Sequence, residues 1–598
     1  MKNDMKKNLF AAAAAVLFMC CSCGPKDGTY EFQIFTTNDI HGRYFDSLYV
    51  DGAPVQGSLL AVSRYVDSVR TACGPENVIL IDAGDCLQGD NAAYYFNYVD
   101  TVSKHLFSRM AEYMKYDAVA VGNHDIETGH AVYDRIGREM KVPFLAGNAV
   151  RTDEDGEVVL KKDGTPDTYF PDYVIIKRNG LKIAVLGFTN PNISNWLSEG
   201  VWHGMTFVSL LPAVQEKVDM VAEKEKPHVM IVAVHSGTGE GDGESYESQG
   251  LDLFKTLRGV DFLICSHDHR PFTAVSDSIC LINSGSHCRN VGHGTIRIEV
   301  KDGKCTARSL SAEIVPIDRN AVNVEMRDFF RKDYEAVKEF TLKPVGWLDE
   351  DLRTRDSYRG MSLYMNLLHT LSVWASGADI SFAAPLTFNG FVHSGQLLYN
   401  DLFTIYPFEN QLFRVRMTGK EIKDYLEYSY GTWINTVSGR PGADEHLLRI
   451  VNADDPRTGQ SRWSFVARSY NFDSAGGLVY TVDVTAPAGE RVKIESLAGG
   501  ETFSEDAEYS VAMTSYRANG GGGLMRAAGI AAEDLDSRVE GRYTEIRNIL
   551  YDYLLEYGVI SAETAGDPAV VGSWAFVPER TAGPLLDRDM ALLFPRRR

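Results

Sequence analysis

Beyond its first two dozen residues, the sequence has no apolar run that approaches the roughly 18 residues a membrane-spanning helix needs. It is also poor in positive charge, because 60 basic residues face 81 acidic ones and the net charge is −21. The electric field of this negative charge repels polyanions, which excludes a protein that coats DNA or RNA. A small anionic substrate is compatible with this charge, provided that cations within the site overrule the global field.

Cysteine is scarce as well, and three of the nine cysteines belong to the N-terminal leader described below. The other six form no CxxC pair, which excludes zinc-ribbon and redox motifs: Cys73, Cys86, Cys265, Cys280, Cys288 and Cys305. One or two disulfides are compatible with an exported protein, but six cysteines allow 15 pairings and the sequence does not choose among them. Cys265 ends an apolar run, so we expect a buried thiol there.

The composition that is present is that of a packed globular protein. Hydrophobic residues make up 44%, charged residues 24% and aromatic residues 11%, which excludes a mainly disordered chain. A chain of 598 residues exceeds the usual size of one domain, about 100–250 residues, so we expect two. We expect this two-domain body to be a monomer.

Residues 1–23 have the pattern of a lipoprotein-type signal peptide. Three lysines within the first seven residues precede an apolar run from Leu9 to Met19, which is too short to span a bilayer. Three cysteines follow it: Cys20, Cys21 and Cys23. A cysteine directly after such a run resembles a bacterial lipoprotein box and predicts a lipid anchor in the cell envelope, facing the periplasm or the cell surface. The alternative is an ordinary secretory signal with incidental cysteines.

The remaining chain divides into two patterns. Over residues 30–318, seven short runs of Val, Ile and Leu alternate with helical stretches, which predicts a layered α/β domain. Residues 319–343 carry apolar side chains at three- and four-residue steps, and we expect a linker helix there. Residues 344–560 mix helical patterns with alternating strands and predict an α+β domain, whereas residues 561–598 are expected to form a surface tail without function.

Polar clusters follow five of the apolar runs of the first domain. The clusters are Asn38 to Gly42, Gly84 to Cys86, Gly122 to Asp125, His235 to Gly237 and Ser266 to His269. Ligands of open α/β sheets bind outside the carboxyl ends of the strands, so we expect the five clusters to converge on one edge. Their aspartates, histidines and asparagine are nitrogen and oxygen ligands for divalent metals. The sequence therefore predicts a metal centre at that edge.

In this order the clusters match D-x-H…GD…GNH…H…GHxH and resemble the calcineurin-like metallophosphoesterases. With the second domain, the chain from about Tyr30 to Gly558 resembles the 5′-nucleotidase family, especially bacterial bifunctional 2′,3′-cyclic-nucleotide phosphodiesterase/3′-nucleotidases. The resemblance implies a layered α/β/β/α sandwich joined by a helix to an α+β substrate-binding domain. It also implies two divalent metal ions (Mn, Zn, Co or Mg) and hydrolysis of nucleotide phosphate esters to nucleosides.

The resemblance assigns roles within the clusters. The implied metal ligands are Asp39, His41 and His269 for one ion, Asn123, His235 and His267 for the other, and Asp85 as the bridge between them. His124 matches the catalytic histidine, which donates to a phosphoryl oxygen or protonates the departing alkoxide. Two positions depart from the family pattern: Glu127 stands where an aspartate usually assists the histidine, and Ser266 replaces the glycine of GHxH. His287 and His293 either support the metal ligands or have purely structural roles, and we expect structural roles.

In the second domain, the resemblance implies substrate contacts at Asn389, Phe408, Tyr516, Asn519 and Gly520. Phe408 and Tyr516 occupy the positions of two aromatic rings that sandwich the base, and stacking suits any base. The glycines at positions 520–523 would let the backbone approach the ligand closely.

The choice between the branches of the family depends on two residues that this chain lacks. Many 5′-nucleotidases carry an aspartate after N-G-G that holds the ribose hydroxyls, but Gly522 stands there in this chain. The segment after Phe388 lacks an arginine that family members use on the phosphates. Both favour the 2′,3′-cyclic/3′ branch over a 5′-nucleotidase or UDP-sugar hydrolase. A lipid-anchored nucleoside-binding protein with an inactive catalytic domain would be expected to lack a ligand, and a thiosulfate-ester hydrolase would not need the aromatic pair.

Overall fold

The computed structural model describes residues 25–197, 199–408, 410–440, 444–454, 461–531 and 534–595. The predicted signal peptide, residues 1–23 with its three cysteines, lies outside this part of the chain. Within it, no helix combines the length and apolar character needed to cross a membrane. The described chain forms two compact units, and the main division falls within a helix, between Val337 and Lys338.

The first unit contains two six-stranded sheets. The order in one sheet is β14 (Lys304–Pro316), β13 (Asn290–Lys301), β1 (Gly28–Thr37), β2 (Val78–Asp82), β3 (Ala118–Ala120) and β4 (Phe144–Leu145). The order in the other is β11 (Phe272–Val275), β12 (Cys280–Asn283), β10 (Phe262–Ile264), β9 (Val229–Val234), β7 (Leu181–Phe188) and β6 (Tyr173–Arg178). All seven apolar runs predicted as strands are strands. β1, β2, β3 and β4 run parallel in one sheet, and β7, β9, β10 and β12 run parallel in the other.

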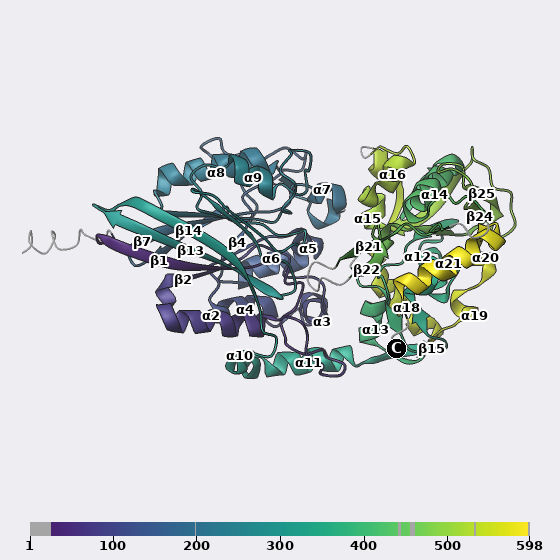
Figure 1. The fold of residues 1–598 in the computed structure, drawn as a ribbon, viewed down its shortest axis with the longest axis horizontal. Helices are drawn as coiled ribbons and strands as arrows, with labels where there is room; N and C mark the ends of the chain where they lie inside the picture. Colours follow the sequence, from purple (N-terminus) through teal and green to yellow (C-terminus); the bar gives the residue numbers. More distant parts are fainter. Residues whose placement is uncertain are drawn as a thin grey trace, which may run out of the picture. The chain divides into compact units, whose positions relative to one another are not determined.

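The two sheets pack face to face and helices cover their outer faces. Fully buried side chains such as Ile34, Ile81, Val185 and Ile231 fill the space between the sheets. The helices α8 (Leu210–Glu225) and α9 (Gly250–Thr256) cover one outer face, and α2 (Leu59–Cys73) and α4 (Leu106–Met114) cover the other (Figure 1). The layered α/β/β/α sandwich implied by the resemblance is therefore confirmed.

The predicted linker helix is two helices, α10 (Val324–Phe329) and α11 (Arg331–Thr341). Phe330 between them leaves the helical conformation (φ −96°, ψ 14°) and is fully buried, with its ring centroid 5.7 Å from that of Tyr113. The chain therefore forms two helices where the sequence pattern predicts one continuous helix.

The second unit mixes sheets and helices, as the α+β prediction requires. Its main sheet has the order β23 (Ser474–Gly476), β17 (Ile380–Ala383), β26 (Glu508–Thr514), β20 (Gln411–Thr418) and β27 (Val539–Glu545). Its longer helices are α12 (Leu363–Ser376), α14 (Gly419–Trp433) and α18 (Ile546–Tyr557). Smaller sheets join β19 (Gly395–Leu398), β15 (Pro344–Leu348) and β28 (Val559–Ile560), and β25 (Val492–Leu497), β24 (Leu478–Asp483) and β29 (Gly572–Val577).

Local sequence signals fix the ends of these helices. Thr418 accepts from the backbone N–H of Glu421, and the Glu421 carboxylate accepts from the N–H of Thr418, a capping box at the start of α14. Ser362 caps α12, and Gly377 ends it in the left-handed conformation with φ of 64°. The chain therefore passes directly from β20 into α14 and from α12 toward β17.

The prediction of a surface tail is wrong for the described residues 572–595. The strand β29 pairs in parallel with β24, and α21 (Glu579–Leu593) buries Leu586 and Met590 in the domain core. Asp589 is fully buried and accepts from the backbone N–H of Leu448 at 2.9 Å. In β29, the buried residues Gly572, Trp574 and Phe576 alternate with more exposed ones, which is the period of two of a strand. The Gly- and Pro-rich composition of this segment obscured that pattern.

The six described cysteines are all free thiols, so no disulfide forms among them. Cys265 is fully buried, which confirms the expectation for that residue.

Candidate metal and substrate sites

The five polar clusters converge at the carboxyl ends of the central strands. Two groups of three side chains could each hold a metal ion: Asp39, His41 and His269, and Asp85, His235 and His267. Within each group, one ligand atom from each side chain lies within 4.8 Å of the ligand atoms of the other two. The resemblance implies the same groups with two differences: it adds Asn123 to the second group, and it makes Asp85 a bridge between both groups, whereas here Asp85 lies in the second group alone. The Asn123 Oδ1 atom lies 2.9 Å from the His267 Nδ1 atom, which places the amide beside the second group.

The first group lies at the ends of β1 and β10. The Nε2 atoms of His41 and His269 are 3.0 Å apart, and His269 Nε2 is 3.5 Å from Asp39 Oδ1. Burial lowers the pKa of His41 to about 4 and keeps its imidazole neutral. A neutral imidazole has a lone pair available for a metal ion.

The second group shows that a positive charge fits between its members. His235 Nδ1 lies 2.8 Å from the carbonyl oxygen of Ala83, an acceptor only, so Nδ1 carries a proton and Nε2 faces Asp85 Oδ2 at 3.0 Å. Burial disfavours the imidazolium, but the Asp85 carboxylate outweighs it and raises the pKa of His235 to about 9. Two buried electron-rich atoms at this distance require a cation between them, either a proton or a metal ion.

The backbone at the site is held in an uncommon conformation. Five of the implied ligands have positive φ angles: Asp39 (48°), His41 (48°), Asp85 (61°), His267 (70°) and His269 (58°). Each left-handed non-glycine residue costs of order 1–3 kcal/mol, and such residues cluster at functional sites. At Gly122 a Cβ atom would lie 2.1 Å from Asp85 Oδ1, so the glycine of the GNH motif makes room for the carboxylate.

Two buried side chains that the sequence analysis did not assign hold the ligands in place. The Asp125 carboxylate accepts from four backbone N–H groups of the Asp85 and Gly122 loops, those of Gly122, Asp85, Cys86 and Leu87, at 2.8–3.0 Å. Asn38 donates from Nδ2 to Asp39 Oδ2 at 2.7 Å and to the Gly285 carbonyl at 2.6 Å. Both residues directly flank predicted ligand motifs, and that position was the available signal.

His124 lies beside the metal groups and belongs to neither. It is the second residue of the short helix α5 (Asn123–Glu127), and its backbone N–H donates to Asp85 Oδ1 at 2.9 Å. Its Nδ1 atom is 2.5 Å from Glu127 Oε2, and its ring centroid is 5.5 Å from that of His41. The longer glutamate therefore reaches the imidazole as an aspartate would.

The two histidines expected to be structural lie in different places. His287 lies next to the site, with its ring centroid 5.3 Å from that of His41, and its backbone N–H donates to the Asp39 carbonyl at 2.8 Å. His293 lies on β13, stacked on Phe35 and 2.7 Å from the side-chain oxygen of Gln33.

The implied substrate residues of the second unit gather at one end of its main sheet. The strands β20 and β26 pair with Leu412 opposite Thr514, so the segment before β20 and the segment after β26 meet there. Phe408 lies in the first segment and Tyr516 in the second, in α15 (Ser515–Ala518). The backbone N–H of Gln411 donates to Ser515 Oγ at 3.2 Å and joins the two segments.

The other substrate residues lie at this same end. Asn519 is the last residue before the glycine loop, and Gly520 has a left-handed φ of 91°. Asn389 is exposed in the loop after β17, which runs parallel to β26. A Cβ atom on Gly521 would lie 2.5 Å from the Tyr516 ring, so this glycine is required for the ring to lie against the loop.

Two buried arginines hold the aromatic segments. Arg517 pairs with Asp473 at 2.7 Å and donates to the carbonyl of Gly521 at 2.8 Å. Arg547 donates to the Phe408 carbonyl at 3.0 Å and is 1% exposed. The sequence analysis assigned neither arginine, because Asp473 lies 44 positions from Arg517 and Phe408 lies 139 positions from Arg547 in the chain.

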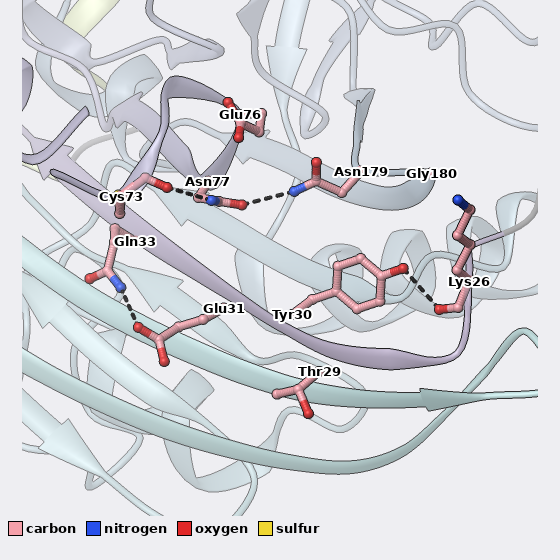
Figure 2. Close-up of a pocket in the computed structure, with 10 residues that line it drawn as sticks. All are labelled: Lys26, Thr29, Tyr30, Glu31, Gln33, Cys73, Glu76, Asn77, Asn179 and Gly180. Carbon is pink, nitrogen blue, oxygen red and sulfur yellow. Dashed lines mark hydrogen bonds between the residues drawn. The ribbon is translucent and has the colours of Figure 1, made fainter. Parts of the chain in front are cut away.

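A cavity of about 740 Å³ lies away from these residues (Figure 2). It opens where β1 and β2 begin, whereas the metal groups follow the ends of those strands. Its lining includes Lys26, Tyr30, Glu31, Asn77 and Asn179, and the Asn179 amide donates to Asn77 Oδ1 at 2.8 Å. None of the implied site residues lines it.

Comparison with protein families matches both units. Residues 32–271 match the calcineurin-like phosphoesterase model, and residues 343–529 match the model of the 5′-nucleotidase C-terminal domain. The first family uses divalent metal ions, in agreement with the two groups of candidate ligands.

Individual relatives agree with this assignment at low identity. The trifunctional nucleotide phosphoesterase protein YfkN of Bacillus subtilis is 23% identical over 94% of this chain, which spans only 40% of that protein's length. The 2′,3′-cyclic-nucleotide 2′-phosphodiesterase/3′-nucleotidase of Salmonella typhimurium is 22% identical over 85% of this chain and 84% of its own length. A Staphylococcus aureus candidate 5′-nucleotidase, solved with α-ketoglutarate, has the same fold, with a TM-score of 0.73 at 19% identity over 91% of this chain and 99% of its own. Together these matches show that the chain belongs to the 5′-nucleotidase family of metallophosphoesterases, hydrolases that pair a calcineurin-like domain with a 5′-nucleotidase C-terminal domain.

Proposed function

We propose that the protein is an exported nucleotide phosphohydrolase that uses two divalent metal ions and releases nucleosides. The observation that carries this proposal is the convergence of two groups of candidate ligands, the second of which contains Asp85, with His124 held beside Asp85 and Glu127. The ion of the first group would be held by Asp39, His41 and His269. That of the second would be held by Asn123, His235 and His267, with Asp85 shared by both.

The chain's own residues would divide the work of hydrolysis. When bound, a pair of divalent ions stabilises the attacking and leaving oxygens of an in-line displacement and supplies hydroxide near neutral pH. His124, paired through Nδ1 with the Glu127 carboxylate, would use Nε2 to donate a proton to a phosphoryl oxygen or to the leaving alkoxide. Asp125 and Asn38 would keep the ligand loops in place while the charge develops.

The second domain would hold the nucleoside. Phe408 and Tyr516 lie at one end of the same sheet, where two rings could stack on a base, and the glycine loop follows Tyr516. The absence of an acid at position 522 favours substrates whose phosphate is on the 2′ or 3′ oxygen, as in the name of the Salmonella relative.

Phosphate release from AMP, 3′-AMP and 2′,3′-cyclic AMP, each with added manganese, tests the proposal. A phosphodiester step followed by a 3′-nucleotidase step should release phosphate from 3′-AMP and 2′,3′-cyclic AMP faster than from AMP. A faster reaction on AMP would assign the chain to the 5′-nucleotidase alternative. No release from any of the three would refute the nucleotide phosphohydrolase.

Alanine at Phe408 or Tyr516 should separate recognition from chemistry. Each substitution should raise KM for nucleotides roughly 5- to 150-fold, which corresponds to about 1–3 kcal/mol for one stacked base. Hydrolysis of bis(4-nitrophenyl) phosphate, which has no base, should change much less. Tyr557→Ala is a matched control, because this tyrosine is 44% exposed at the far end of α18. Equal losses on both substrates would mean that the two rings support only the fold.

Export and lipid anchoring can be tested through the leader. Globomycin, which blocks cleavage of lipoprotein signals, should cause a precursor to accumulate, and labelled palmitate should enter through Cys20, Cys21 or Cys23. A soluble product without label would show that these cysteines are incidental and that the leader is an ordinary secretory signal.

A further inference from the structure

A glutamate outside all of the sequence motifs contacts one of the implied metal ligands. Glu247 lies in the loop between β9 and α9, and its Oε1 atom is 2.9 Å from His267 Nε2. The His267 side chain is 13% exposed and that of Glu247 is 51% exposed, so the contact lies at the rim of the second ligand group.

The position of Glu247 is set by its backbone rather than by its side chain alone. Its carbonyl oxygen accepts from Ser236 Oγ at 2.9 Å and from Asn190 Nδ2 at 3.0 Å. Both donors are fully buried, and they follow the ends of β9 and β7. These two hydrogen bonds hold the main chain of Glu247 against the ends of β9 and β7, so its side chain starts from a fixed point beside the second ligand group.

The contact decides which nitrogen of His267 has the lone pair. A carboxylate only accepts hydrogen bonds, so a neutral His267 in this contact has its proton on Nε2 and its lone pair on Nδ1. Nδ1 is the atom that faces Asn123 Oδ1 at 2.9 Å, and both of these atoms are then electron-rich. This arrangement suits a cation between them. Carboxylate–histidine pairs of this kind orient metal-binding imidazoles and raise their basicity.

We propose that Glu247 is a positioning residue that holds His267 in the tautomer and orientation needed to bind the second metal ion. This inference rests on the proposed function, since only a bound cation requires the Nδ1 lone pair. Glu247 is not a ligand in this proposal and acts only through His267.

Metal retention of the full-length protein tests this role. The manganese-loaded wild type, Glu247→Ala and Glu247→Gln are challenged with graded EDTA, and bound metal is measured by mass spectrometry. Glu247→Ala should bind the more weakly held ion 10- to 100-fold less tightly, the usual effect of removing such a partner. Glu247→Gln, which still offers an oxygen acceptor without the charge, should lose less. Glu244→Ala is the matched control, because Glu244 is an exposed glutamate of the same loop, and it should retain metal as the wild type does.

The outcomes separate the two proposals. Melting temperatures in excess EDTA should be equal for all four proteins, because the Glu247 side chain is half exposed. Wild-type metal affinity in Glu247→Ala, or an equal loss in Glu244→Ala, would overturn the positioning role while the two-metal site stands. A wild type that binds fewer than two ions would contradict the proposed function and the positioning role with it.

Discussion

Replacing Asp85 by alanine should abolish hydrolysis of bis(4-nitrophenyl) phosphate and reduce the metal content below two ions per chain. Asp85 is 1% exposed, and its two carboxylate oxygens face different partners. Oδ2 lies 3.0 Å from His235 Nε2, and Oδ1 accepts the backbone N–H of His124 at 2.9 Å. One substitution would therefore remove negative charge from the metal centre and also free the helix that carries His124.

A second variant separates charge from shape. Asp85→Asn retains an oxygen and nearly the same volume, so it should fold as the wild type does but still lose metal and activity. Metal content by mass spectrometry and thermal melting, measured together, distinguish this result from unfolding. Full activity with normal metal content in Asp85→Ala would refute a shared carboxylate between the two ions.

The sequence predicted which candidate ligands would lie together because their placement follows largely from topology. Parallel strands end at the same edge, so polar residues after β1, β2 and β3 lie together in one sheet and those after β9 and β10 lie together in the other. The face-to-face packing of the two sheets then brings both sets together. The apolar runs were long and unbroken enough to be recognised as strands, which settled the layered fold. The family pattern then added the grouping of the ligands, and the structure brings the same residues together.

The supporting residues were not predictable in the same way. Asn38 forms hydrogen bonds with Gly285 and Ser284. Glu247 contacts Asn190 and His267. Only the folded sheets bring these residues together. Nothing in the local pattern of a glycine-rich loop distinguishes Glu247 from Glu244. Arg547 contacts the Phe408 carbonyl across 139 positions of sequence, and no periodicity reports such a contact.

The C-terminal error has a different cause. Composition predicted a tail because glycine, proline and alanine are frequent after residue 560, yet β29 completes a sheet with β24 and α21 covers the core. β29 and β24 are far apart in the sequence. Their pairing depends on an apolar surface that the rest of the domain leaves uncovered, and the local sequence does not show that surface. The alternation of Gly572, Trp574 and Phe576 was the signal that should have outweighed composition.

Replacing His124 by asparagine should lower kcat by about 10²- to 10⁴-fold, the usual contribution of a general acid, and leave two metal ions bound. The contact that joins this residue to Asp85 is made by its backbone N–H, which asparagine also provides. The imidazole itself belongs to neither ligand group, so its removal takes away a proton donor and no metal ligand.

Glu127 provides a graded comparison for the same step. Its carboxylate lies 2.5 Å from His124 Nδ1 and would stabilise the imidazolium and fix the ring, so Glu127→Gln should reduce kcat less than His124→Asn does. In the double variant the two losses should not add, because Glu127 acts through the imidazole. Steady-state kinetics on 3′-AMP with parallel metal analysis measures all three variants. If His124→Asn empties a metal site, then His124 is a ligand and its role as proton donor is wrong; if the losses add fully, Glu127 acts on the reaction by another route.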